Sequence, residues 1–151
     1  MTEFDSHDLP AFRVWREEFQ PPPDGNAYLA EHLSVTAATL FAELMSPDLV
    51  LVQGCVILGA RYTPDNFEQW WSSEEGNVAS IERALNHLHL WDIFEPAGAV
   101  EERAVEALAV RIARSWKLHA ERQFPDRKFV AEVTDEYGPT VVMSSQPRAQ
   151  P

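Results

Sequence analysis

The sequence predicts an α+β fold: a two-layer domain in which an antiparallel sheet of about four strands, from two hairpins, packs against three to four helices. Apolar residues recur at three- and four-residue spacing over residues 26–45 and 99–123, which is typical of amphipathic helices. Residues 49–58 and 128–145 each carry two apolar or alternating runs around turn residues, which is typical of hairpins. Because an isolated hairpin is only marginally stable in water, we expect the two to join in one sheet.

The chain of 151 residues fits a single domain. Residues 1–25 are expected to form a peripheral N-terminal arm that ends in a stiff proline-rich segment and docks through Trp15 and Phe19. Residues 26–146 are expected to form the α+β domain, and the polar residues 147–151 a frayed tail.

The first part of the domain is predicted as a helix followed by a hairpin. The helix is expected to run from Asn26 to Met45 and to end at the Ser46-Pro47-Asp48 segment. Gln53-Gly54 then supplies the tight turn between strands Leu49–Val52 and Cys55–Leu58. Apolar residues occupy both faces of this hairpin, so we expect both faces to be at least partly covered.

Two capped helices are predicted next. Thr63 as N-cap and Pro64 at the first helical position predict a short helix through Trp71. Asn77 can cap a second helix, expected to span residues 78–93 because Pro96 follows it.

A long helix and the second hairpin complete the predicted domain. The helix is expected at residues 99–123. The hairpin strands are expected at Lys128–Thr134 and Thr140–Ser145, around a turn at residues 135–139.

The net charge of −12 is large for this length and unevenly distributed. Residues 26–95 contain ten acids and two bases, whereas residues 96–151 contain eight of each. Nucleic-acid binding needs clustered Lys and Arg, so this distribution argues against a nucleic-acid partner. It permits steering toward a basic protein, but a role in solubility alone is the favoured explanation of the charge.

The sequence also predicts a cytoplasmic protein. No stretch approaches the roughly 18 apolar residues that a membrane span needs, so no membrane partner is expected. The first residues, Met1–Asp5, show no basic and apolar signal-peptide regions. The single cysteine, Cys55, forbids an internal disulfide and lies in an apolar strand, where an inert buried thiol is expected.

The densest cluster of polar side chains is the run of residues 86–92. On a helix through this run, Glu82, Asn86 and His89 form a stripe at i, i+4 and i+7, at the edge of the buried face. His87 then points to the opposite side, so His87 and His89 are not expected to chelate a metal. His89 could act as a general base or a metal ligand, with Glu82 orienting it and Asp92 or His32 completing the set. The favoured interpretation is structural: His89 is a core histidine that is hydrogen-bonded to Asn86, Glu82 or a strand carbonyl.

No signature of a cofactor or metal site is found. The six glycines are dispersed, so no phosphate-binding loop is predicted. No HExxH motif or pair of CxxC motifs is present, so neither a cofactor nor a metal is expected.

A separate set of residues could bind a partner. Adjacent Trp side chains on a helix lie about 100° apart, so two neighbouring tryptophans cannot both point into the centre of one core face. Partly exposed Trp and Tyr are enriched at interaction sites, and acidic neighbours would suit a basic partner. The candidate binding residues are Trp70, Trp71, Glu68, Glu74, Glu75 and Tyr137.

Two functions are compatible with these observations. The favoured hypothesis is a small acidic, non-enzymatic interaction protein that masks a basic protein partner in the manner of an antitoxin or immunity protein. The alternative is a small enzyme or ligand-binding domain with a pocket around His89, Glu82 and Asn86. A homodimer joined through an exposed strand edge is also possible.

Overall fold

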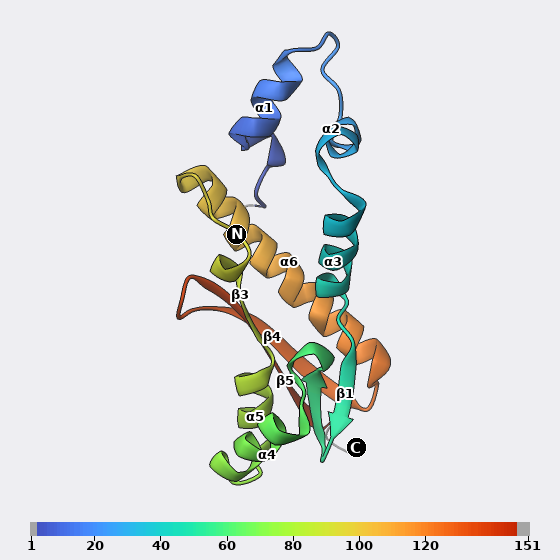
Figure 1. The fold of residues 1–151 in the computed structure, drawn as a ribbon, viewed down its shortest axis with the longest axis vertical. Helices are drawn as coiled ribbons and strands as arrows, with labels where there is room; N and C mark the ends of the chain where they lie inside the picture. Colours follow the sequence, from blue (N-terminus) through green and yellow to red (C-terminus); the bar gives the residue numbers. More distant parts are fainter. Residues whose placement is uncertain (1–2, 148–151) are drawn as a thin grey trace.

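The computed structural model describes residues 3–147 and has an α+β architecture, as the sequence predicts. Within that range it contains six α-helices and two small antiparallel sheets, of two and three strands. Figure 1 shows an elongated molecule, with both sheets in the body and the first two helices projecting from one end. No helix in the described range is both long and apolar enough to span a membrane.

Three short helices, which we call the helical arm, lie at the N-terminal end: α1 (Pro10–Glu17), α2 (Gly25–His32) and α3 (Val35–Met45). The prediction of one helix over residues 26–45 is wrong, because the chain breaks between α2 and α3. Ser34 is the N-cap of α3, and its side chain accepts a 3.0 Å hydrogen bond from the backbone N–H of Ala37. A serine that caps a new helix in this way competes with continuation of the preceding one.

Aromatic packing joins α1 to α2. The Nε1 of Trp15 donates a 2.8 Å hydrogen bond to Glu31, and its ring meets the ring of Tyr28 edge-on at 5.2 Å. The ring of Phe19 lies 5.1 Å from that of Trp15. Trp15 and Phe19, predicted to dock residues 1–25 onto the body, are thus placed in this cluster beside α2.

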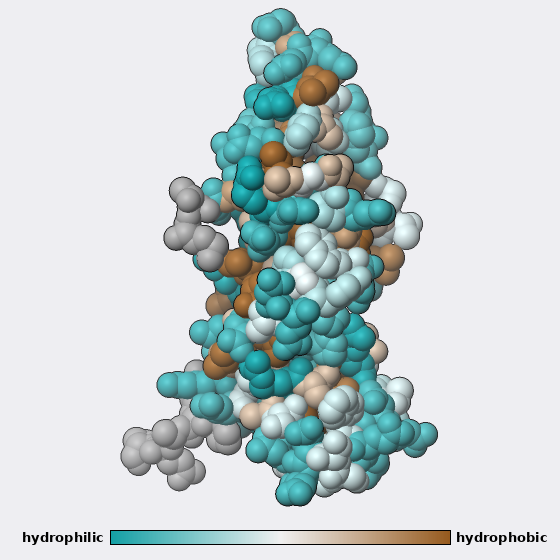
Figure 2. Space-filling view, turned by 90° about the vertical axis from the view of Figure 1, so that its left-hand side faces the viewer, coloured by the Kyte–Doolittle hydropathy of each residue, from teal (hydrophilic) through white to brown (hydrophobic). Residues whose placement is uncertain are grey.

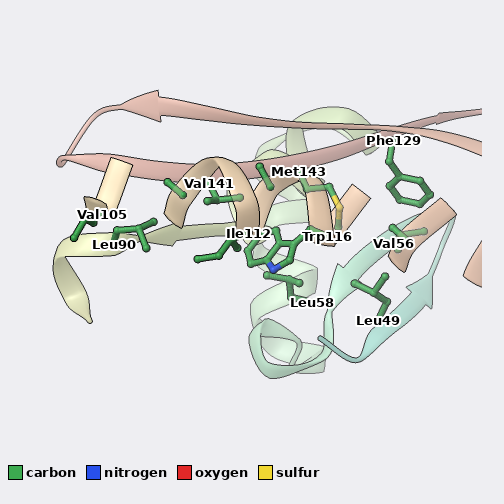
Figure 3. Packing of buried hydrophobic residues seen from close by; sticks show 13 residues of the cluster. Leu49, Val56, Leu58, Leu90, Val105, Ile112, Trp116, Phe129, Val141 and Met143 are labelled. Carbon is green, nitrogen blue, oxygen red and sulfur yellow. The ribbon is translucent and has the colours of Figure 1, made fainter. Parts of the chain in front are cut away.

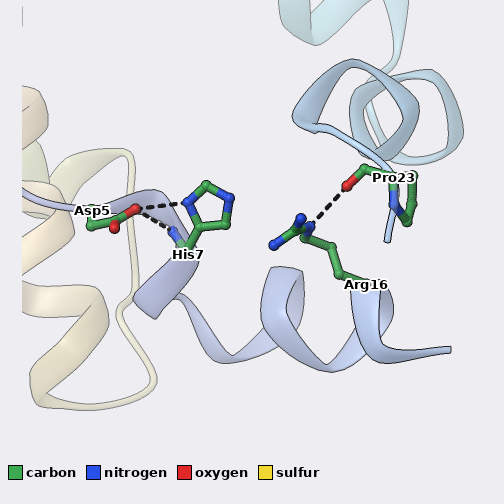
Figure 4. Close-up of polar contacts among 4 residues, drawn as sticks. All are labelled: Asp5, His7, Arg16 and Pro23. Carbon is green, nitrogen blue, oxygen red and sulfur yellow. Dashed lines mark hydrogen bonds and ion pairs between the residues drawn. The ribbon is translucent and has the colours of Figure 1, made fainter. Parts of the chain in front are cut away.

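Polar contacts brace the beginning and end of α1 (Figure 4). Arg16 donates a 2.8 Å hydrogen bond from Nε to the carbonyl oxygen of Pro23, which fixes the proline-rich segment against the helix. Asp5 accepts hydrogen bonds from the backbone N–H of His7 at 2.9 Å and lies 2.8 Å from its ring. The backbone hydrogen bond, followed by the ring contact, lowers the pKa of Asp5.

The first hairpin, β1 (Leu49–Val52) and β2 (Cys55–Leu58), forms as predicted. Gln53 and Gly54 adopt φ values of 47° and 83°, the left-handed conformations required by a tight two-residue turn. All four β2 residues are buried, which confirms that both faces of this strand are covered. Val56 and Leu58 face the main core, and Cys55 and Ile57 face a second cluster under α4 and α5.

The second sheet has the order β3-β5-β4, with β3 at His87–His89, β4 at Arg127–Asp135 and β5 at Pro139–Pro147. The prediction that both hairpins join in one four-stranded sheet is therefore wrong. β3 pairs with the edge of β5 opposite β4, and the first hairpin forms a two-stranded sheet of its own.

The helices of the body begin at the predicted caps, but one of them is shorter than predicted. Thr63 caps α4 (Pro64–Ser73), and Asn77 caps α5 (Val78–Leu85). The prediction of a helix over residues 78–93 is wrong because the chain after Asn86 pairs with β5. Long-range strand pairing here overrides the local helical pattern.

The main core lies between α6 (Ala99–Gln123), the second sheet and the first hairpin (Figure 3). The buried side chains are supplied by α6, by β1, β2, β4 and β5, and by the turn after β3. At the C-terminal end of α3, the Nε1 of Trp116 donates a 2.8 Å hydrogen bond to the carbonyl oxygen of Leu44, which anchors the helical arm to α6. The labelled core residues in Figure 3 are Leu49, Val56, Leu58, Leu90, Val105, Ile112, Trp116, Phe129, Val141 and Met143.

β5 extends through Pro147, one residue into the predicted frayed tail. Residues 148–151, which make up the rest of that tail, lie outside the described residues.

Candidate functional site

Glu82 and Asn86 are fully buried at the end of α5, with exposures of 0% and 1%. The side-chain oxygen of Asn86 accepts a 2.8 Å hydrogen bond from the backbone N–H of Leu58, and its Nδ2 donates at 2.7 Å to the carbonyl of Val56. Glu82 Oε1 accepts a 2.8 Å hydrogen bond from the backbone N–H of Val56. The two side chains therefore pair with the edge of β2 as a neighbouring strand would.

The same two residues also bind β5, the nearest strand of the other sheet. Glu82 accepts hydrogen bonds from Ser145, one from its backbone N–H and one at 2.7 Å from its hydroxyl. The backbone carbonyl of Asn86 accepts a 3.0 Å hydrogen bond from the N–H of Met143. The last turn of α5 thus bridges the two sheets, and the polar edges of β2 and β5 are satisfied without direct strand pairing.

The electrostatics of Glu82 fit this bridging position. Burial raises the pKa of its carboxyl group, and the hydrogen bonds from Val56 and Ser145 offset part of that effect. Arg127, which lies 3.3 Å from the hydroxyl of Ser145, acts in the same direction as the hydrogen bonds. Both carboxylate oxygens of Glu82 therefore accept hydrogen bonds that hold β2 and β5 in place.

His89 does not belong to this group, so the predicted stripe of Glu82, Asn86 and His89 on one helix is wrong. His89 lies on β3, where its Nδ1 is 2.8 Å from the hydroxyl oxygen of Thr140. Its ring also meets the ring of Tyr137 edge-on, at 5.7 Å. The structure therefore brings Glu82 and Asn86 together and leaves His89 on another element.

His87 and His89 share one face of the second sheet, because residues i and i+2 of a strand point to the same side. Their ring centres are 5.0 Å apart, and both side chains are half-buried. The expectation that His87 and His89 point in opposite directions is wrong, because residues 87–89 form strand β3 and not part of a helix.

Two of the cavities formed by residues 3–147 open to solvent, and neither of these two is lined by Glu82, Asn86 or His89. The first, of about 800 Å³, lies between the end of α3 and the first hairpin, with Arg61 and His87 at its edge. The second, of about 980 Å³, lies between the residues before α1, α6 and the β4–β5 turn, with Trp91 in its wall.

The predicted binding residues on α4 lie at the end of the molecule remote from α1 and α2 (Figure 1). Trp70 and Trp71 are both half-buried and pack against the second hydrophobic cluster. The remaining candidates are accessible: Glu68 and Glu75 are exposed, Glu74 is half-buried, and Tyr137 is 60% exposed at the β4–β5 turn.

The helical arm presents an apolar surface that the sequence analysis missed. Neither α2 nor α3 contains a buried residue. Four large apolar residues of this segment, which we call the arm surface, are exposed: Leu29 at 49%, Leu33 at 46%, Val35 at 83% and Leu40 at 60%. Figure 2 shows apolar residues at the surface of the N-terminal end as well as over the body. The sequence carries no local signal of this exposure, because Leu29, Leu33 and Leu40 follow the period of one buried helical stripe.

Comparison with protein-family models, with curated proteins and with solved structures finds no match to this chain. We therefore infer its function from the geometry alone.

Proposed function

We propose that this protein is a small acidic, non-enzymatic interaction protein of the cytoplasm that binds and masks a basic protein partner, in the manner of an antitoxin or immunity protein. The observation that carries the proposal is the arm surface. α2, α3 and the residue Leu33 between them expose four large apolar side chains, and neither helix contains a buried residue.

Exposed apolar side chains gathered on one segment favour a binding role. Single exposed leucines are ordinary, but larger apolar patches mark interaction sites. Complete burial of a fully exposed side chain of this kind contributes about 1.5–3 kcal/mol, and the four side chains of the arm surface have 46–83% of their surface left to bury. A partner that covers Leu33, Val35 and Leu40 would therefore gain a substantial part of the free energy of a stable complex.

The charge around the arm surface favours a basic partner. The six acids of residues 17–60 include Glu31 on α2 and Glu43 on α3, both exposed. Because no Lys or Arg neutralises them locally in sequence, a partner with Lys or Arg around an apolar patch would complement this segment. Such complementarity accelerates association and excludes acidic partners.

The proposal is tested by affinity capture at low and high salt, followed by reconstitution with the purified partner. We expect a basic protein whose dissociation constant rises at least tenfold with Leu33→Asp plus Leu40→Asp. Glu31→Lys plus Glu43→Lys should weaken binding mainly at low salt, because exposed charges are screened by ions.

Charge reversal of Glu68, Glu74 and Glu75 on and after α4 is the matched control. If these changes weaken the complex while the arm variants do not, the arm surface is not the binding site. An acidic partner, or a homodimer that the arm variants dissociate in light-scattering measurements, would overturn the proposal.

We do not carry forward the alternative of an enzyme or ligand-binding pocket around His89, Glu82 and Asn86. No observation favours it, because the side chains of Glu82 and Asn86 are bonded to β2 and β5 and line neither cavity.

A further inference from the structure

We propose that His87 and His89 form a surface site for one divalent transition-metal ion of the class that imidazole prefers, such as Zn²⁺, Cu²⁺ or Ni²⁺. The site is independent of the proposed partner-binding function. It depends on three features of β3: the shared face of the two side chains, the tautomer in which each ring is held, and the spacing of the rings.

The tautomer of His87 is defined by its backbone contact. Its Nδ1 lies 2.8 Å from the carbonyl oxygen of Ala84, and a carbonyl can only accept a hydrogen bond. Nδ1 therefore carries the proton of the neutral ring, and Nε2 has a free lone pair.

The tautomer of His89 follows from a chain of two hydrogen bonds. The hydroxyl of Thr140 donates to the carbonyl oxygen of Gly138 at 3.2 Å, which uses its single hydrogen. With that hydrogen used, its oxygen accepts from Nδ1 of His89 at 2.8 Å, and Nε2 of the neutral His89 ring then keeps a free lone pair. Metal-binding histidines in proteins are oriented by such a hydrogen bond from the other ring nitrogen.

The separation of the two ring centres matches that of a shared ion toward which both Nε2 atoms turn. With Zn–N bonds of about 2.0–2.1 Å, a metal lies about 3.2 Å from each imidazole centre, and a tetrahedral angle of about 109° then separates the centres by about 5.2 Å. The observed separation is 5.0 Å.

The site has two protein ligands. Within residues 3–147, no cluster of three or more His, Cys, Asp or Glu side chains is positioned to hold a metal. The remaining coordination positions would therefore be filled by water or by an external ligand, as in sites that stay open.

The test is a titration of the 151-residue chain with ZnCl₂, in which calorimetry measures the heat of binding. We expect one Zn²⁺ per chain, with affinity at least tenfold weaker in either His87→Gln or His89→Gln. Thr140→Val should weaken binding by about 10- to 100-fold, because it removes the group that orients His89.

His32→Gln is the matched control. The Nδ1 of His32 also lies near a backbone carbonyl oxygen, that of Tyr28 at 2.9 Å, but His32 has no second histidine beside it on its helix. This variant should bind Zn²⁺ like the unmodified protein. Unchanged affinity in both His87→Gln and His89→Gln, or no binding to the unmodified protein at millimolar Zn²⁺, would overturn the proposal.

A measurement on the unmodified chain covers the case in which a variant fails to fold. Electron paramagnetic resonance with one equivalent of Cu²⁺ should show two equatorial nitrogen ligands. A spectrum with oxygen ligands only, or with a single nitrogen, would contradict the two-histidine site.

Discussion

Replacement of Asn86 tests the inference that the end of α5 serves as a strand edge for β2. Asn86→Ala removes the partners of two buried backbone groups, the N–H of Leu58 and the carbonyl of Val56. A buried polar group without a partner costs about 1–3 kcal/mol, so the expected loss in the free energy of unfolding is about 2–6 kcal/mol. The lower end applies if a water molecule enters the space and bridges the two groups. Whole domains are stable by only about 5–15 kcal/mol, so this one side chain carries a large share.

Asn86→Asp keeps the shape of the side chain and isolates the hydrogen-bonding pattern. One carboxyl oxygen can still accept from the N–H of Leu58. The other replaces Nδ2, which lies 2.7 Å from the carbonyl of Val56, and it can donate there only when it is protonated. The fold therefore raises the pKa of the introduced carboxyl group above its value in the unfolded chain, and the associated stability is present at low pH and lost as pH rises.

Urea unfolding monitored by tryptophan fluorescence at pH 7 and at pH 5 measures both effects. The free energy of unfolding of Asn86→Asp should increase relative to that of Asn86→Ala when the pH is lowered. A cost below about 1 kcal/mol for Asn86→Ala would refute the bridging role, since two unpartnered buried groups cost more than that. The bridging role is also refuted if the difference in the free energy of unfolding between Asn86→Asp and Asn86→Ala is the same at pH 5 and at pH 7.

Three further outcomes are expected. Gly138→Ala should displace the β4–β5 turn and markedly lower the midpoint of thermal unfolding. Gly138 has φ +65°, and an added Cβ would lie 1.8 Å from Nε1 of Trp91. As a control, Gly25→Ala should change the midpoint little, because open space surrounds Gly25. Cys55 should react with a thiol reagent at pH 8 only as fast as the protein unfolds, because it is fully buried and burial raises the pKa of its thiol to about 11. Burial raises the pKa of Glu82 in the folded protein above its unfolded value of about 4.3. The unmodified protein should therefore lose stability relative to Glu82→Gln as pH rises from below the unfolded pKa through the folded pKa. Urea midpoints of the two proteins that run parallel between pH 4 and pH 7 would contradict this.

Local features of the sequence predicted most of the elements. Thr63 and Asn77 cap the helices that they were expected to cap, and Gln53-Gly54 turns the first hairpin. The helix at residues 99–123 has the predicted bounds. These features depend on chemistry within a few residues, which periodicity and capping rules describe well.

The topology and the site depended on contacts distant in sequence. β3 is three residues long, and its strand conformation depends on pairing with Thr140, Val141 and Val142. The local pattern of residues 78–93 contains no indication that β5, far along the chain, has an unpaired edge with which residues 87–89 can form a strand. The helical prediction therefore placed His89 beside Glu82 and separated it from His87, and both placements were reversed by the same pairing.

The break between α2 and α3 was missed for a different reason. Leu29, Leu33 and Leu40 continue an apolar pattern across it, so periodicity favoured one buried stripe. The Ser34 cap interrupts the helix, and the exposed positions of these leucines show that an apolar pattern alone does not establish which side chains are buried within the chain.

The bridge at the end of α5 also has a consequence for the internal motions of the molecule. The amide hydrogens of Val56, Leu58 and Ser145 belong to two different sheets, yet all are bound by side chains from one helical turn. Neither sheet can release these hydrogens to solvent by fraying at its own ends while that turn stays in place. Opening of the turn would expose all three, so their hydrogen exchange should report a single cooperative event that couples the first hairpin to the second sheet.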